Sequence, residues 1–177
     1  MRTIIALAFL TVFNFGFAQE KFDITSVEKF QKELNTYYSD AKTSPLMAED
    51  LAKFESLDFF PINEKFFVVA KFIRTENEKP FEMKTSTDRK PMYVKYGEAH
   101  FVIDGKSLQL NIYKNIELSK KEEYKDYLFL PFSDMTSGKD SYIGGKYIDM
   151  KVPNGDTIAI DFNKAYNPLC AYNYKYS

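Results

Sequence analysis

The polar residues best suited to chemistry gather in two short segments near the C-terminus. One runs from Asp134 to Lys146, and the other runs from Asp161 to Cys170, the only cysteine of the chain. A few polar groups among aromatic rings are typical of a small-ligand site. The sequence therefore predicts a pocket between the two segments, with nine candidate ligand-binding residues: Asp134, Thr136, Tyr142, Lys146, Asp161, Asn163, Tyr166, Asn167 and Cys170.

Each residue type would have its own task in such a pocket. Lys146 would neutralise an anionic group of the ligand, the amides of Asn163 and Asn167 would fix its orientation, and the tyrosine rings would form the walls. The alternative is structural: both asparagines would bond to the backbone and hold the turn before Pro168. The tyrosines would then be half-buried rings, and the protein would be a structural or interaction protein without a ligand site.

Catalysis is a further alternative, in the form of a hydrolase that uses Asp161 or Cys170. Cys170, His100 and an asparagine would together imitate a cysteine protease, in which the histidine takes the proton of the thiol. However, His100 is the only histidine, and we expect it on the polar face of a hairpin. A cysteine nucleophile in an oxidising compartment would also be prone to oxidation. Small-ligand binding therefore remains the leading hypothesis.

No metal ion and no organic cofactor is expected. A metal site could in principle combine Asp134, Asp161 and His100. However, the spacing of potential ligands in the sequence resembles neither HExxH, CxxC nor a calcium loop. The segment Gly144-Gly145-Lys146 lacks the remaining glycine and the Ser or Thr of a phosphate loop. No serine lies in a nucleophile elbow motif.

The charge balance excludes some classes of partner. The chain has 24 Lys and Arg residues against 25 Asp and Glu residues, which gives a formal net charge of −1. The two signs are interspersed, so no basic surface for nucleic acid or for an anionic membrane is expected. The predicted partner is a small ligand, for which Lys146 suggests an anionic group, and the sequence indicates no particular protein partner.

Residues 1–18 have the features of a signal peptide. One Arg precedes an apolar run from Ile4 to Phe17, and small residues at Gly16 and Ala18 mark the expected cleavage site. The run is too short for a membrane span, which needs about 20 apolar residues. We therefore expect an exported, soluble protein, periplasmic or extracellular, without stable membrane anchoring. Residues 19–177 would then form a single β-rich domain.

Helical signals occupy residues 25–55 of this domain. Thr25 and Glu28 have the spacing of a capping box, in which two side chains satisfy free backbone donors at a helix start. A second helix start is expected at Ser44-Pro45, a cap residue followed by proline. Apolar residues at spacings of three and four predict one buried stripe on the first helix: Val27, Phe30, Leu34, Tyr37 and Ala41.

Strand signals dominate from residue 59 to residue 177. The clearest hairpin turns at Asp104-Gly105, a pair that accepts the positive φ angles of a type I′ turn. A two-residue loop places Phe101 opposite Leu108 on the apolar face. It also places His100 opposite Gln109 on the polar face.

A second hairpin is expected around Asn154-Gly155. A two-residue loop would mix polar and apolar faces, whereas a three-residue loop with a glycine bulge separates them. The longer loop pairs Val152 with Ile158, Met150 with Ile160 and Ile148 with Phe162, and leaves Asp161 and Asn163 on the opposite face. The predicted fold class is therefore mainly β (α+β). It is an antiparallel, partly closed, barrel-like sheet with one or two N-terminal helices.

Three segments are familiar as motifs: LPFSDMTSG (130–138), SYIGGKY (141–147) and DFNKAYNPLCAY (161–172). Together they resemble the uncharacterised bacterial family known as domain of unknown function 1684, over roughly Leu51 to the end of the chain. The last motif is the most specific of the three. The resemblance implies a single domain without an established activity.

Two departures from the family pattern concern the candidate site. Members of the family usually carry Arg where this chain has Lys146, and lysine offers a single mobile charge instead of a planar fork. The resemblance also implies a Cys-Pro-rich segment and a strand after Ser177, which this sequence lacks. The cysteine of that segment would be the natural disulfide partner of Cys170, so we expect Cys170 to be a free thiol here.

Overall fold

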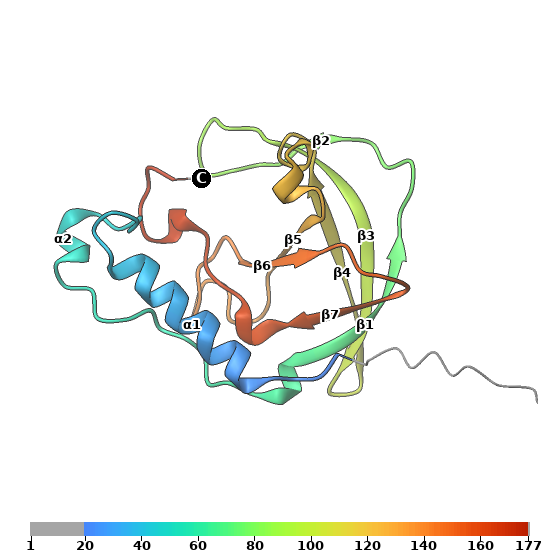
Figure 1. The fold of residues 1–177 in the computed structure, drawn as a ribbon, viewed down its shortest axis with the longest axis horizontal. Coiled ribbons are helices and arrows are strands. Elements are labelled where there is room, and N and C mark those ends of the chain that lie inside the picture. Colours follow the sequence, from blue (N-terminus) through green and yellow to red (C-terminus); the bar gives the residue numbers. More distant parts are fainter. Residues whose placement is uncertain (1–19, 177) are drawn as a thin grey trace, which may run out of the picture.

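The computed structural model describes residues 20–176, so the predicted signal peptide lies outside the described residues. Two helices come first, α1 (Ile24–Ser39) and α2 (Ala48–Leu51), and the strands follow. Figure 1 shows a sheet that curls into a half-barrel, with the helices and the C-terminal segment gathered beside its open side. The predicted fold class is confirmed. None of the helices in residues 20–176 is both long and apolar enough to cross a bilayer.

Antiparallel strands form one seven-stranded sheet in the described part of the chain. Their order across the sheet is β6-β5-β4-β3-β1-β7, and β2 pairs with β3 off this path. Short 3₁₀ turns connect or follow the strands: η1 (Glu64–Phe66), η2 (Leu118–Lys120), η3 (Glu122–Tyr124), η4 (Phe162–Lys164) and η5 (Leu169–Ala171). The strands are β1 (Phe67–Arg74), β2 (Phe81–Glu82), β3 (Met92–Ile103), β4 (Lys106–Asn115), β5 (Tyr127–Phe132), β6 (Lys146–Lys151) and β7 (Thr157–Asp161).

The core lies on the inner face of the curled sheet. Successive side chains of a strand point to opposite faces, so alternate residues of each strand reach this core. Its fully buried members come from six strands: Ala70, Ala99, Ile112, Leu128, Leu130, Ile148 and Ile160, with Ile148 slightly less enclosed than the others. Gly97 of β3 belongs to the same face, because a Cβ there would lie 2.4 Å from the ring of Phe72.

The hairpin predicted at Asp104-Gly105 is confirmed. Both turn residues have positive φ, +51° and +72°, as a type I′ turn requires. β3 and β4 pair in the predicted register, with Phe101 opposite Leu108 and His100 opposite Gln109. This register directs Phe101 and Leu108 to the inner face.

The hairpin predicted around Asn154-Gly155 is wrong. β6 pairs with β5, and β7 pairs with β1, so the two strands lie at opposite ends of the strand order. Ile158 faces Ala70 of β1 rather than Val152. The predicted inner face still holds for β7, where Ile158 and Ile160 are buried. Side-chain alternation fixes the face of a strand, but it does not name the neighbouring strand.

The first helix begins earlier than the capping-box pattern predicts. Asp23 is its N-cap, and the Asp23 carboxylate accepts a hydrogen bond from the Thr25 N–H at 3.0 Å. Thr25 therefore lies inside the helix, and the predicted box from Thr25 to Glu28 is wrong. The reason is that aspartate caps a helix at least as well as threonine does.

The buried stripe of α1 also differs from the prediction. Val27 and Tyr38 are its buried residues, whereas Tyr37 is 43% exposed. Val27 and Tyr38 are about three helical turns apart, which puts them on one face. The helix ends at Ser39, so the predicted stripe member Ala41 lies beyond it and is exposed.

The second helix is shorter than predicted and starts later. Its N-cap is Met47 rather than Ser44. The Ser44 hydroxyl instead accepts a hydrogen bond from the Leu46 N–H at 3.2 Å, which forms a local turn. Pro45 in this turn is fully buried, and its carbonyl accepts a 2.7 Å hydrogen bond from the buried Asn173 amide. The turn thus fastens the C-terminal segment beside the helices.

Candidate functional site

A cavity of about 930 Å³ opens on the inner face of the half-barrel. Small-ligand sites in proteins typically have volumes of about 300–1,000 Å³. One side of the cavity comes from β3, β4 and the end of β5, and the other side comes from α1, residues 57–66 and the C-terminal segment. The lining is mainly apolar and aromatic, and it includes Leu34, Tyr38, Phe60, Phe101, Ile103, Leu108, Leu110, Phe132, Phe162 and Tyr172.

Three phenyl rings form a continuous floor in this cavity. Strand alternation turns Phe101 inward from β3, Phe132 ends β5, and Phe162 begins η4. The ring centroid of Phe162 lies 5.6 Å from that of Phe101 and 5.2 Å from that of Phe132. Rings at these separations pack in favourable tilted or edge-on geometry. The floor is therefore apolar, and its three rings pack against one another.

Lys146 brings charge to the cavity wall. Its side chain is only 8% exposed. Its ammonium group donates to Asp134 Oδ1 at 2.9 Å, to Thr136 Oγ1 at 2.6 Å and to Ser141 Oγ at 3.2 Å. A lysine has three N–H donors, so the three bonds use all of them. We call these four residues the lysine cluster.

Two aromatic rings enclose the same ammonium group. Lys146 Nζ lies 5.6 Å from the ring centroid of Phe60 and 5.5 Å from that of Phe132. A cation at this distance is attracted by the electron-rich face of a ring. Phe60 is 52% exposed, so this part of the cavity wall is open to solvent.

The carboxylate of Asp134 is ionised in this setting. Partial burial raises the pKa of the Asp134 carboxyl group, but the hydrogen bonds from Thr136 and Lys146 outweigh it and leave the pKa below its ordinary value. Both the hydroxyl and the N–H of Thr136 donate to Asp134 Oδ1. The lysine cluster is therefore an ion pair that two hydroxyl groups support.

Asn163 lines the cavity, yet its amide binds the backbone of a distant segment. The Asn163 side chain accepts from the Asn63 N–H at 2.9 Å and donates to the Asn63 carbonyl at 3.1 Å. The Asp161 carboxylate accepts from the Asn163 N–H at 3.1 Å and from its amide at 2.8 Å. Asn163 therefore bonds to the backbone, as in the structural alternative, but it holds the distant segment around Asn63 against the end of β7 rather than the turn before Pro168.

We expect Asn163→Ala to lower the free energy of unfolding by about 0.5–1.5 kcal/mol, since it removes the two hydrogen bonds to the exposed backbone of Asn63. Asn167→Ala should cost less, because the two Asn167 hydrogen bonds are long, at 3.3 and 3.4 Å. Urea unfolding followed by far-UV circular dichroism measures both. Equal losses, or no loss for Asn163→Ala, would contradict a scaffolding role that belongs to Asn163.

Tyr166 and Asn167 also line the cavity. Asn167 accepts from the Tyr142 N–H and donates to the Tyr172 hydroxyl. The Tyr166 hydroxyl donates to Asp149 Oδ1 at 2.8 Å. Burial and, next, the charge of Asp149 raise the pKa of Tyr166 far above its ordinary value, so this tyrosine stays protonated.

Tyr142 and Cys170 contact each other away from the cavity lining. Their hydrogen bond, and to a lesser degree burial, raises the pKa of the Tyr142 hydroxyl. Within residues 20–176 Cys170 is a free, half-buried thiol. His100 has another partner, because its Nε2 atom lies 2.9 Å from Glu98 Oε2. The geometry therefore gives no support to a pair of Cys170 and His100.

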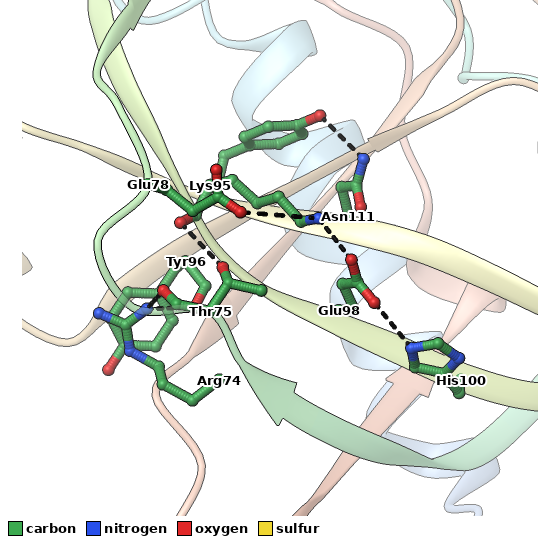
Figure 2. A network of polar contacts seen from close by, with 9 residues as sticks. Arg74, Thr75, Glu78, Lys95, Tyr96, Glu98, His100 and Asn111 are labelled. Atoms are coloured by element: carbon green, nitrogen blue, oxygen red, sulfur yellow. Dashed lines mark hydrogen bonds and ion pairs between the residues drawn. The ribbon is translucent and has the colours of Figure 1, made fainter.

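A second polar network lies on the outer face of the sheet, opposite the core (Figure 2). The Glu98 carboxylate bridges Lys95 and His100 on β3. The hydrogen bond from Lys95, followed by that from His100, lowers the pKa of Glu98. The same bond to Glu98 raises the pKa of Lys95.

In the described part of the chain, no three His, Cys, Asp or Glu residues lie together so that they could hold a metal ion.

The structure thus divides the nine predicted residues. Asp134, Thr136, Lys146, Asn163, Tyr166 and Asn167 line the cavity, whereas Tyr142, Asp161 and Cys170 do not. Sequence reasoning missed Ser141 and most of the apolar lining. The alternation of apolar and polar residues along the first hairpin could have identified Phe101 and Leu108 as lining residues. Phe60 lies in a segment without such periodicity, so no sequence pattern indicated its place in the cavity.

Comparison with known proteins identifies the family of this chain. The family model described as protein of unknown function (DUF1684) matches residues 52–177. The chain belongs to this family. The DUF1684 match covers the sheet and the lysine cluster, while α1 and α2 precede it. The family description assigns no activity.

A solved structure has a similar fold. It is the solution NMR structure of an uncharacterised protein of Haloarcula marismortui, with a TM-score of 0.66 and 30% sequence identity. The similarity covers 86% of this chain and 82% of the archaeal chain. No curated protein matches this DUF1684 chain.

Proposed function

We propose that this protein binds a small, largely apolar ligand inside the half-barrel. The cavity of about 930 Å³, with an aromatic floor and one polar cluster in its wall, is the observation that supports this function. An apolar ligand would gain from leaving water for the rings of Phe101, Phe132 and Phe162. The hydroxyl and charged groups around Lys146 would orient its polar end.

Exposed apolar side chains at the cavity support the same proposal. Phe60 is 52% exposed and Met135 is 83% exposed, and both belong to the lining. Apolar groups that gather at a solvent-accessible hollow mark binding sites more often than isolated ones do. A bound apolar ligand would cover both side chains and remove their surface from water.

The two rival functions have less support. Neither Asp161 nor Cys170, the residues considered for hydrolysis, lines the cavity. The Asp161 side chain is only 12% exposed, and its Oδ1 atom accepts from the backbone N–H and the amide of Asn163. A purely structural protein would fill the space between sheet and helices with its own side chains, whereas this space remains open. Binding without turnover is therefore the function that we propose.

Titration with N-phenyl-1-naphthylamine, a neutral apolar dye that fluoresces when it leaves water, tests the proposal. We expect saturable binding by the wild-type protein. Leu108→Trp should weaken it by about tenfold or more, a loss of about 1.4 kcal/mol, because the larger ring fills the cavity. Leu108 lines the cavity and is 43% exposed, so the indole can be accommodated without disturbing the fully buried core.

The matched control is Val102→Trp on the same hairpin. Val102 is 58% exposed and does not line the cavity. This variant should bind the dye like the wild type, and circular dichroism should show that both variants are folded. Absence of saturable binding by the wild type, or equal effects of the two substitutions, would refute the proposed site.

A further inference from the structure

We infer that the polar end of the ligand is cationic, that is, a protonated amine on an apolar body. This inference rests on the proposed function and specifies its ligand class. It reverses the expectation of an anionic ligand that the presence of Lys146 alone suggests. The charges, the hydrogen bonds and the rings around the cavity each support it.

The hydrogen bonds of Lys146 leave it no donor for an anion. Its three N–H groups already bind Asp134, Thr136 and Ser141. An anionic ligand would have to displace at least one of these oxygens from a side chain that is 8% exposed. Such an exchange replaces one bond by another and yields little net affinity.

The charges that line the cavity favour a cation. Three carboxylates belong to the lining, those of Asp58, Asp134 and Asp140, against a single ammonium group, that of Lys146. Lys146 pairs with Asp134, so two negative charges remain without a basic counterpart among the described lining residues. Charges at the edge of a low-dielectric hollow act more strongly than charges in bulk water.

Asp134 itself offers a place for the amine. The Thr136 N–H, the Thr136 hydroxyl and Lys146 Nζ all donate to the same oxygen of Asp134, Oδ1. Its side chain is 45% exposed, so the carboxylate still reaches solvent. An ionised carboxylate accepts about four hydrogen bonds through its two oxygens, which leaves capacity for a donor from a ligand. The Phe60 ring, whose centroid lies 5.6 Å from Lys146 Nζ, would add a cation–π contact.

Three chain-matched competitors test the inference: decylamine, decanol and decanoate at pH 7, each displacing N-phenyl-1-naphthylamine. They share one apolar chain and differ in the charge of the head group. We expect decylamine to displace the dye at a concentration about fivefold or more below that of decanoate, with decanol between them. Equal or stronger displacement by decanoate would overturn the inference.

Substitutions of the carboxylates test whether they cause the preference for decylamine over decanoate. Asp134→Asn should weaken the binding of decylamine and strengthen the binding of decanoate, because the charge of Lys146 is then no longer neutralised. Asp140→Asn should weaken the binding of decylamine, and it changes no residue of the lysine cluster. The test therefore stays valid if Asp134→Asn disturbs the loop. Glu123→Gln, at an exposed position outside the lining, is the control and should leave the order unchanged.

The same titration separates the two levels of the proposal. If the dye binds and decanoate displaces it better than decylamine does, the cationic ligand is contradicted but the proposed apolar binding site is still supported. Dye binding with a preference for decylamine that both Asp variants reduce supports both. Failure of the dye to bind contradicts the proposed function, and the inference falls with it.

Discussion

Replacing Gly145 by alanine should destabilise the domain by about 3 kcal/mol or more. Gly145 has a φ of +91°, which costs an L residue about 1–2 kcal/mol. The new Cβ would also lie 2.6 Å from the Phe132 carbonyl oxygen and 2.9 Å from Ser133 Oγ. Such overpacking against backbone typically costs a further 1–3 kcal/mol or so. Because Lys146 is the next residue, the loss should extend to the lysine cluster.

Gly155→Ala is the matched control for this experiment. Its φ of +129° imposes the same kind of backbone penalty, but nothing lies within 4 Å of the position that a Cβ would take. Urea unfolding of both variants therefore isolates the steric part of the cost. If the two substitutions lower the free energy of unfolding equally, close packing at Gly145 is not what requires glycine there.

Lys146→Met should lower the free energy of unfolding by about 2–3 kcal/mol. Methionine keeps an unbranched apolar stem but removes three hydrogen bonds and the charge partner of Asp134. Breaking a buried ion pair costs about 3–5 kcal/mol, and the 45% exposure of Asp134 reduces this, because water can solvate the remaining carboxylate. Urea unfolding gives the value.

Hydrogen exchange shows where the loss from Lys146→Met is localised. The amides of residues 133–145 should exchange faster, since the side chain of Lys146 joins Asp134, Thr136 and Ser141 of this loop. Lys139→Met, at an exposed position of the same loop, should leave exchange and stability nearly unchanged. If Lys146→Met costs no more than Lys139→Met, the lysine cluster does not stabilise the loop.

Local sequence patterns predicted those parts of the fold that local physics determines. The turn at Asp104-Gly105 follows from two adjacent residues that tolerate positive φ, and the register of β3 and β4 follows from the turn. Alternation likewise placed Ile158 and Ile160 in the core. Their partner strand could not be predicted, because Ala70 of β1 lies far away in the sequence and no turn connects the two strands.

The candidate site divides in the same way. Asp134, Thr136 and Lys146 stand out in the sequence as polar residues close together, and the structure unites them. Their hydrogen bonds could not be predicted, and these bonds decide whether Lys146 is available to a ligand. The cavity depends on long-range packing of Phe60 and the C-terminal segment against the inner face of the sheet, which no short sequence pattern encodes.

The strand order has a consequence for biosynthesis. Among the described strands β7 is the last to be made, yet it pairs with β1, the first of them. Until residues 157–161 have left the ribosome, residues 67–71 lack the neighbour that covers one edge of β1 in the finished sheet. An exposed strand edge is a template for pairing with another chain. A nascent chain therefore carries this exposed edge from the synthesis of residue 74 until residues 157–161 have emerged, and only then can the described sheet be completed.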